Sequence, residues 1–131
     1  MQKIIIIFIL LSATIGCAHG QYPPMSSSSI CDDKPHYDRQ LSNVTVILNT
    51  DMHGGYVSIP PCPEKGYSVD FSKSDLGDIK NRALVEAISR SAVLPGSPIE
   101  LVVSGYIRKF NGEEIRDVMM IEKIDSFSLN R

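Results

Sequence analysis

The chain has 131 residues, the size of one domain that buries its own core. Its 13 lysines and arginines against 15 aspartates and glutamates give a formal net charge of −2. This balance gives no general attraction to a phosphate backbone, and it argues against a constitutive nucleic-acid-binding protein.

The N-terminus has the pattern of a secretory signal peptide. Lys3 supplies a positive charge, and residues 4–11 are an uninterrupted apolar run that small residues follow. A membrane span needs about 20 apolar residues, so this run is too short to be one. We therefore expect residues 1–16 to direct export. A buried core element is the alternative interpretation of the same run.

The end of this segment carries a further motif. Thr14-Ile15-Gly16-Cys17 resembles the bacterial lipobox, in which a small residue precedes a cysteine that is diacylated and becomes the first mature residue; Thr14 stands where that motif prefers Leu. The resemblance implies acyl chains such as palmitate on Cys17, and two chains give stable anchoring. The protein would then lie on the periplasmic face or outer membrane of a bacterial envelope. The alternative is cleavage near Gly20, which would release a soluble secreted protein.

Residues 17–40 are rich in Pro and Ser and have almost no periodicity. This composition predicts a flexible tether that links the anchor to a globular domain of residues 41–131.

Two cysteines remain if Cys17 is lipidated. Export places Cys31 and Cys62 in an oxidising compartment, which favours a disulfide between them. The bond would close a loop of roughly 30 residues, worth about 3–4 kcal/mol in the chain-entropy model. A metal site is the alternative, although no Cys-x-x-Cys or His-x-x-x-His spacing supports it. Its candidate ligands are Asp32, Asp33, His36 and His53. We expect neither a metal nor a cofactor.

Three strands are predicted next, over residues 44–48, 56–59 and 67–71. The first is rich in β-branched residues, and the third alternates apolar and polar residues with period two. A turn cluster at residues 49–51 follows the first strand, and a second turn is predicted over residues 64–66. Pro60-Pro61-Cys62-Pro63 ends the second strand.

A helix is predicted to follow, capped by Ser74 or Asp75 and ended by Pro95-Gly96-Ser97-Pro98. Apolar residues recur along it at helical spacing. They are Leu76, Ile79, Ala83, Ala87 and Ile88.

Two long strands are predicted over residues 99–110 and 113–124, joined by Asn111-Gly112. Asn-Gly is typical of a two-residue hairpin in a type I′ turn, because both residues tolerate positive φ. Gly105, in the middle of the first strand, predicts a bend or bulge of the kind that helps to close a barrel.

The predicted class is mainly β with one helix, in the order β-β-β-α-β-β. That order resembles the OB-fold, a five-stranded partly open barrel, over about residues 41–126. The alternative is an α+β open antiparallel sheet with the helix packed on one face.

The resemblance implies a ligand site on strands two and three and on two flanking loops. Tyr56 and Tyr67 would supply aromatic platforms, with His53 in the first loop. Tyr106 and Arg108 extend the candidate site onto the terminal hairpin. The short predicted loop of that hairpin favours a shallow groove. Placement of the two tyrosines at the edge of the core, and pairing of the hairpin charges across strands, are the alternatives.

The function we expect is that of a non-catalytic binding or structural module in the cell envelope, with a possible protein partner and no nucleic-acid partner. One alternative is a domain that binds an oligosaccharide or a single-stranded ligand. Another is a small secreted or periplasmic enzyme that uses His53 with Asp51 or Asp70, although the chain has no G-x-S-x-G motif to supply a nucleophile.

Overall fold

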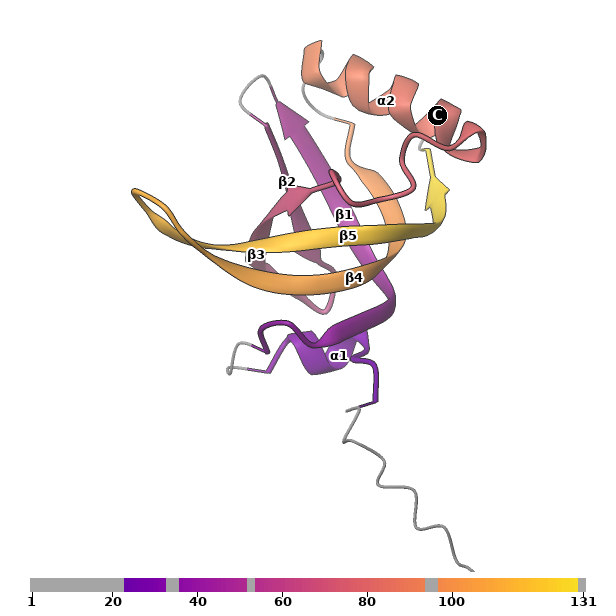
Figure 1. The fold of residues 1–131 in the computed structure, drawn as a ribbon. Helices are drawn as coiled ribbons and strands as arrows, with labels where there is room; N and C mark the ends of the chain where they lie inside the picture. Colours follow the sequence, from indigo (N-terminus) through magenta and orange to yellow (C-terminus); the bar gives the residue numbers. More distant parts are fainter. Residues whose placement is uncertain (1–22, 33–35, 52–53, 94–96, 130–131) are drawn as a thin grey trace, which may run out of the picture.

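The computed structural model describes residues 23–32, 36–51, 54–93 and 97–129 (Figure 1). The elements in chain order are α1 (Ser27–Ile30), β1 (Gln40–Asp51), β2 (Gly54–Ile59), β3 (Cys62–Asp70), the 3₁₀ turn η1 (Ile79–Asn81), α2 (Arg82–Val93), β4 (Ile99–Asn111) and β5 (Ile115–Ser128). Figure 1 shows the strands wrapped around one another, with α2 over one end and α1 at the other.

The five strands close into a barrel in the order β1-β2-β3-β5-β4. Strands β3 and β5 run parallel, and every other neighbouring pair is antiparallel. Because β1 pairs with both β2 and β4, the sheet has no free edge strand at this seam. The expected mainly β, OB-fold-like barrel is confirmed, and the alternative of an open antiparallel sheet is wrong.

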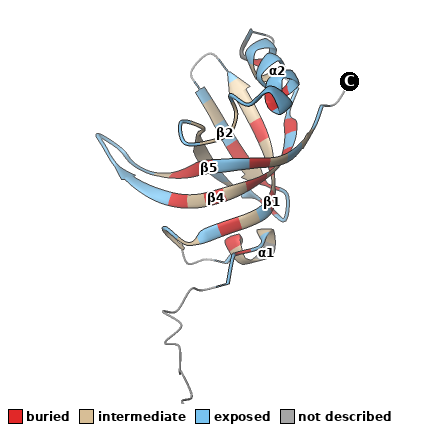
Figure 2. Ribbon diagram, turned by 45° about the vertical axis from the view of Figure 1, so that its right-hand side comes forward, coloured by how far each residue is buried: buried red, intermediate tan, exposed pale blue. Residues whose placement is uncertain are grey.

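The core follows from strand alternation. In β1 the side chains of Val44, Val46 and Leu48 are buried, while the residues between them are partly exposed (Figure 2). Alternate side chains of a strand point to opposite faces, so this set fills the interior of the barrel. From α2, Leu84 adds a fully buried side chain at one end.

Gly105 lies where the ladder between β4 and β5 changes register. A Cβ atom at this position would overlap the carbonyl oxygen of Met120 on the neighbouring strand. The predicted irregularity at Gly105 is thus confirmed, because only a residue without a side chain permits this close approach of the two backbones.

The third strand begins earlier than predicted. Pro60 and Pro61 form a tight turn, and Ile59 pairs with Cys62 directly across it. The residues expected to form a second turn, 64–66, therefore belong to β3, where Gly66 pairs with Ser58.

The terminal hairpin does not turn at Asn111-Gly112. Asn111 pairs with Ile115, so the loop is residues 112–114, and neither Asn111 nor Gly112 has the positive φ of a type I′ turn. The predicted two-residue turn is wrong. The space above Gly112 is taken by the ring of Phe110, which a side chain at 112 would meet.

The helix begins at Arg82 and not at residues 74–75. The carboxylate of Asp75 does not cap a helix, because its Oδ1 accepts the N–H of Ile124 at 2.8 Å and its Oδ2 pairs with Lys80. Ile79, expected on the apolar face, is 87% exposed in η1, whereas Leu84 is the residue that α2 buries completely.

The predicted tether is corrected where the structure describes it. Met25 and Ile30 are 2% and 3% exposed within the core, and Met25 N–H donates to the carbonyl of Gln40 at 2.9 Å. The predicted Cys31–Cys62 disulfide is present, with the two Cα atoms 5.6 Å apart. The segment from Met25 to Cys31 is therefore part of the domain and not a free linker.

The predicted signal peptide and Cys17 lie outside the described residues, as do residues 18–22 and 33–35 of the predicted tether. Within the part of the chain that is described, no helix combines the length and hydropathy needed to cross a membrane.

Candidate functional site

One row of paired residues crosses four strands on the outside of the barrel. Tyr56 of β2 pairs with Ser68 of β3, Ser68 pairs with Val118 of β5, and Val118 pairs with Arg108 of β4. Neighbouring strands lie about 4.8 Å apart, so Tyr56 and Arg108 are separated by three such steps, roughly 14 Å along the sheet. Register thus places two of the sequence-predicted residues on one face.

Two further rows flank the first on the same face. On one side, Asp70 pairs with Met120, which pairs with Tyr106. On the other side, Phe110 pairs with Arg116, in the part of the hairpin that projects beyond the barrel (Figure 2). Tyr106 therefore also joins this face.

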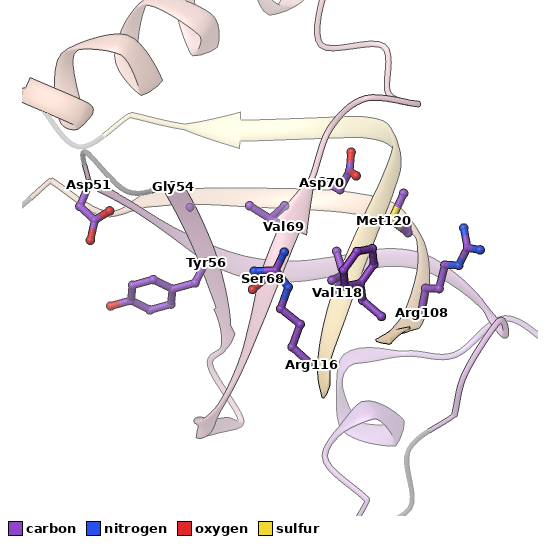
Figure 3. Close-up of a pocket in the computed structure, with 12 residues that line it drawn as sticks. Asp51, Gly54, Tyr56, Ser68, Val69, Asp70, Arg108, Arg116, Val118 and Met120 are labelled. Carbon is purple, nitrogen blue, oxygen red and sulfur yellow. The ribbon is translucent and has the colours of Figure 1, made fainter. Parts of the chain in front are cut away.

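Apart from Tyr106, the residues of these rows line a groove of about 500 Å³, and Figure 3 shows the side chains around it. The floor is apolar, because Val118 and Met120 are 9% and 6% exposed. Tyr56 and Phe110 are about half exposed and supply aromatic faces. Near the hairpin tip, β4 and β5 contribute Phe110 and Arg116 to the lining of the groove.

The apolar floor is the feature that the sequence interpretation missed. Residues 118–121 are four buried apolar residues in succession. A strand with only one buried face alternates, so an unbroken apolar run signals that both faces are covered. In this strand Met119 and Ile121 face the interior, while Val118 and Met120 lie under the groove.

Charged residues lie at both sides of the groove. Arg116 reaches back over β3 toward Ser68, and its guanidinium lies 5.3 Å from the centre of the Phe110 ring (Figure 3). Asp70 accepts the N–H of Ser72 at 2.7 Å, and the hydrogen bonds from Ser72 hold the pKa of its carboxyl below the usual range, with a further contribution from Lys73.

Tyr67 does not share the face of Tyr56. It pairs with Val57, whose side chain is fully buried, and it packs against the core. Burial, with the nearby carboxylate of Asp117, raises the pKa of the Tyr67 phenol. The prediction of a shared Tyr56 and Tyr67 platform is wrong. The alternation of Tyr67, Val69 and Phe71 already carried the signal that they point inward.

Tyr67 lines a different hollow, of about 300 Å³, between the N-terminal segment and β3. Lys65 crosses beside it, where its Nζ donates to the carbonyls of Cys31 and Asp32 at 3.0 and 2.7 Å. On the hairpin side, Tyr37 donates its O–H to Asp117 at 2.8 Å. This hollow is separate from the groove on the outer face.

Tyr106 and Arg108 line a small extension of about 320 Å³, together with Asp38. The hydroxyl of Tyr106 accepts a long hydrogen bond of 3.4 Å from Lys73. Because Arg108 lines both hollows, it marks the point where the groove continues toward the N-terminal segment.

His53 lies outside the described residues, and Asp51 and Gly54 on either side of that loop line the groove. Among the residues described, no group of three or more His, Cys, Asp or Glu is arranged to hold a metal ion.

Comparison with known proteins found no matching family model, no matching curated protein and no matching solved structure.

Proposed function

We propose that this protein is a non-catalytic binding module of the cell envelope, and that its ligand occupies the groove across β2, β3, β5 and β4. The observation that carries the proposal is the row from Tyr56 to Arg108. It combines an exposed aromatic ring, an apolar floor and a cation in one hollow of ligand size.

The chemistry of the groove supports binding over catalysis. Asp70, one of the two carboxylates that the enzymatic alternative pairs with His53, is held ionised by the hydrogen bonds of Ser72. A general base acts best with a pKa near the working pH, which a lowered pKa opposes. The groove instead presents surfaces that hold a ligand.

We further propose that the module is exported and held at a membrane through acyl chains on Cys17. The signal pattern and the lipobox-like motif support this location. The Cys31–Cys62 bond also supports it, because disulfides persist in oxidising compartments.

Backbone NMR of the oxidised protein, titrated with soluble cell-wall fragments, tests the binding function. We expect amide shifts to change at Tyr56, Ser68 and Val118 and to stay constant in α2. Tyr56→Ala should weaken binding by roughly tenfold, as expected for loss of one aromatic stacking surface. Val85→Ala, on the exposed side of α2, is the matched control. Shift changes confined to α2, no shift changes, or unchanged affinity in Tyr56→Ala would contradict the proposal.

A further inference from the structure

We propose that the ligand of the groove is a short oligosaccharide that carries a carboxylate, with its acid group at Arg116, positive charge from Arg108 beyond it and its neutral rings along Tyr56. This inference rests on the proposed binding function and adds the chemical class of the ligand and its direction in the groove.

Arg116 supplies the anion-binding group, and Arg108 adds a second positive charge on the neighbouring strand. Arg108 pairs with Val118, and Arg116 lies two residues before Val118, so the arginines are diagonal neighbours on adjacent strands. Such positions lie about 7–8 Å apart. From them Arg116 extends over β3 toward Ser68, and Arg108 extends in the opposite direction (Figure 3). A guanidinium presents a planar fork of N–H donors that fits a carboxylate.

Neither arginine is neutralised by an acid in the described part of the chain. Arg108 forms no ion pair or hydrogen bond there, and the contact of Arg116 is with the Phe110 ring. The ring fixes the position of the Arg116 guanidinium and leaves its N–H donors available to a ligand. The positive charge of the hairpin side is thus presented to the groove.

The opposite end of the groove has different chemistry. Asp51 lies beside the β1–β2 loop, on the same side as the exposed ring of Tyr56 (Figure 3). A carboxylate has several acceptor sites for hydroxyl groups, and an aromatic ring offers a flat apolar surface. Neutral sugar rings present hydroxyls at their edges and C–H groups on their faces, and they therefore fit this end.

This polarity separates an acidic sugar from a nucleic acid. A single strand carries a phosphate at every nucleotide, so its backbone would meet Asp51 and Asp70 as well as the arginines. The formal net charge of −2 adds no attraction for a polyanion. A ligand with neutral rings at one end and a carboxylate at the other meets complementary groups along the whole groove.

Isothermal titration calorimetry on the oxidised full chain tests the proposal with three probes of similar size. The probes are 3′-sialyllactose, which has two neutral rings and one carboxylate at its end, its methyl ester and a short single-stranded oligothymidine. We expect the acid to bind, and the ester and the oligothymidine to bind at least about tenfold more weakly, because a charge-assisted hydrogen bond is lost or misplaced. Arg116→Gln should weaken the acid roughly 10- to 100-fold and leave the ester unchanged.

Lys109→Gln is the matched control, since it removes the same charge from the same hairpin. Lys109 pairs with Asp117 and therefore lies on the opposite face from Arg108. Arg108→Gln is the second test variant, and thermal unfolding checks that each variant folds.

Each other result overturns the inference in a distinct way. Equal binding of acid and ester would show a neutral-glycan site and leave the binding function standing. Tighter binding of oligothymidine would assign the groove to nucleic acid. Equal loss in Arg116→Gln and Lys109→Gln would show attraction by net charge alone. If no probe binds, the class is wrong, and the NMR titration with cell-wall fragments decides separately whether the groove binds a ligand.

Discussion

At the scale of single residues, Asp75 ties the segment before the helix to the last strand. Its Oδ1 accepts the N–H of Ile124 and its Oδ2 pairs with Lys80, both at 2.8 Å. Its carbonyl accepts from Nδ2 of Asn81, a polar side chain that is only 2% exposed. Burial opposes ionisation of the carboxyl, but the hydrogen bonds from Lys80 and Ile124 outweigh it and lower the pKa of Asp75.

We expect Asp75→Ala to reduce the free energy of unfolding by about 1–3 kcal/mol at neutral pH, because the Ile124 N–H loses its acceptor. Because the pKa of Asp75 is lower in the folded than in the unfolded protein, its ionised carboxylate stabilises the fold at pH values above the unfolded pKa of about 3.9. This stabilisation is lost as the pH falls through the folded pKa. Urea unfolding at pH 7 and near pH 3 checks this. The difference in free energy of unfolding between wild type and variant should be smaller near pH 3 than at pH 7. An equal difference at both pH values would contradict the role of the ionised carboxylate.

The candidate site shows which functional residues can be predicted from the local sequence pattern. Tyr56, Tyr106 and Arg108 were predicted from residue type, and the structure brings all three to one face. Their neighbours in the groove could not be predicted, because cross-strand partners depend on register. Register here shifts near Gly105, and a shift of one residue exchanges the two faces of a strand.

At the scale of elements, sequence periodicity predicted the order and type of every barrel element but misplaced several of their ends. The helix start failed because Ser74 and Asp75 have the chemistry of helix caps but are used elsewhere. Ser74 Oγ accepts the N–H of Leu76 in a local turn, and Asp75 binds β5. The Asn-Gly turn failed because pairing continues through Asn111. For Asp75 and Asn111 the cause is the same, since partners on β5 outweigh local preference.

The N-terminal segment is the element whose packing could not be predicted from composition. Its Pro and Ser content is typical of a linker, yet Met25 and Ile30 are buried. Two apolar side chains and one disulfide are enough to hold a short segment. The hydrogen bonds of Lys65 to the carbonyls of Cys31 and Asp32 add a further attachment.

We expect reduction of Cys31–Cys62, which closes a sequence separation of 31 residues, to lower the free energy of unfolding by about 3–4 kcal/mol. Amide hydrogen exchange should accelerate first at Met25 and Asp38, whose N–H groups bind Gln40 and Ile107. Chemical denaturation with and without reductant measures the first effect. A Cys31→Ser, Cys62→Ser double variant serves as the control. An unfolding midpoint that does not move on reduction would contradict this account.

At the scale of the whole molecule, the barrel is covered at both ends and open to a ligand on one outer face (Figures 1 and 2). Helix α2 is attached at one end, where Thr50 Oγ1 and Ser91 Oγ are 2.5 Å apart, and the N-terminal segment covers the other. The groove lies between these ends, on the strands themselves. If the chain is attached to a membrane through its N-terminus, α2 lies at the opposite end of the barrel and does not cover the groove.

The proposed anchor predicts a labelling result in cells. A fatty-acid analogue should label the wild-type protein and fail to label Cys17→Ala, because the acyl chains attach at that thiol. Membrane fractionation should then recover the wild type with membranes and the variant in the soluble fraction. Equal labelling of both proteins would contradict the anchor, and the absence of label from both would favour cleavage near Gly20.

The burial of Met25 sets a limit on where an anchored protein can work. Only eight peptide steps join Cys17 to Met25, and at roughly 3.6 Å per step they reach at most about 29 Å. A tether that extended to residue 40 would reach nearly three times as far. The hydrocarbon core of a bilayer is about 30 Å thick. The tether would therefore let Met25 move no further from its anchor than about the thickness of that core. An anchored protein would then meet the ligand of its groove within the layer above the membrane that this reach allows.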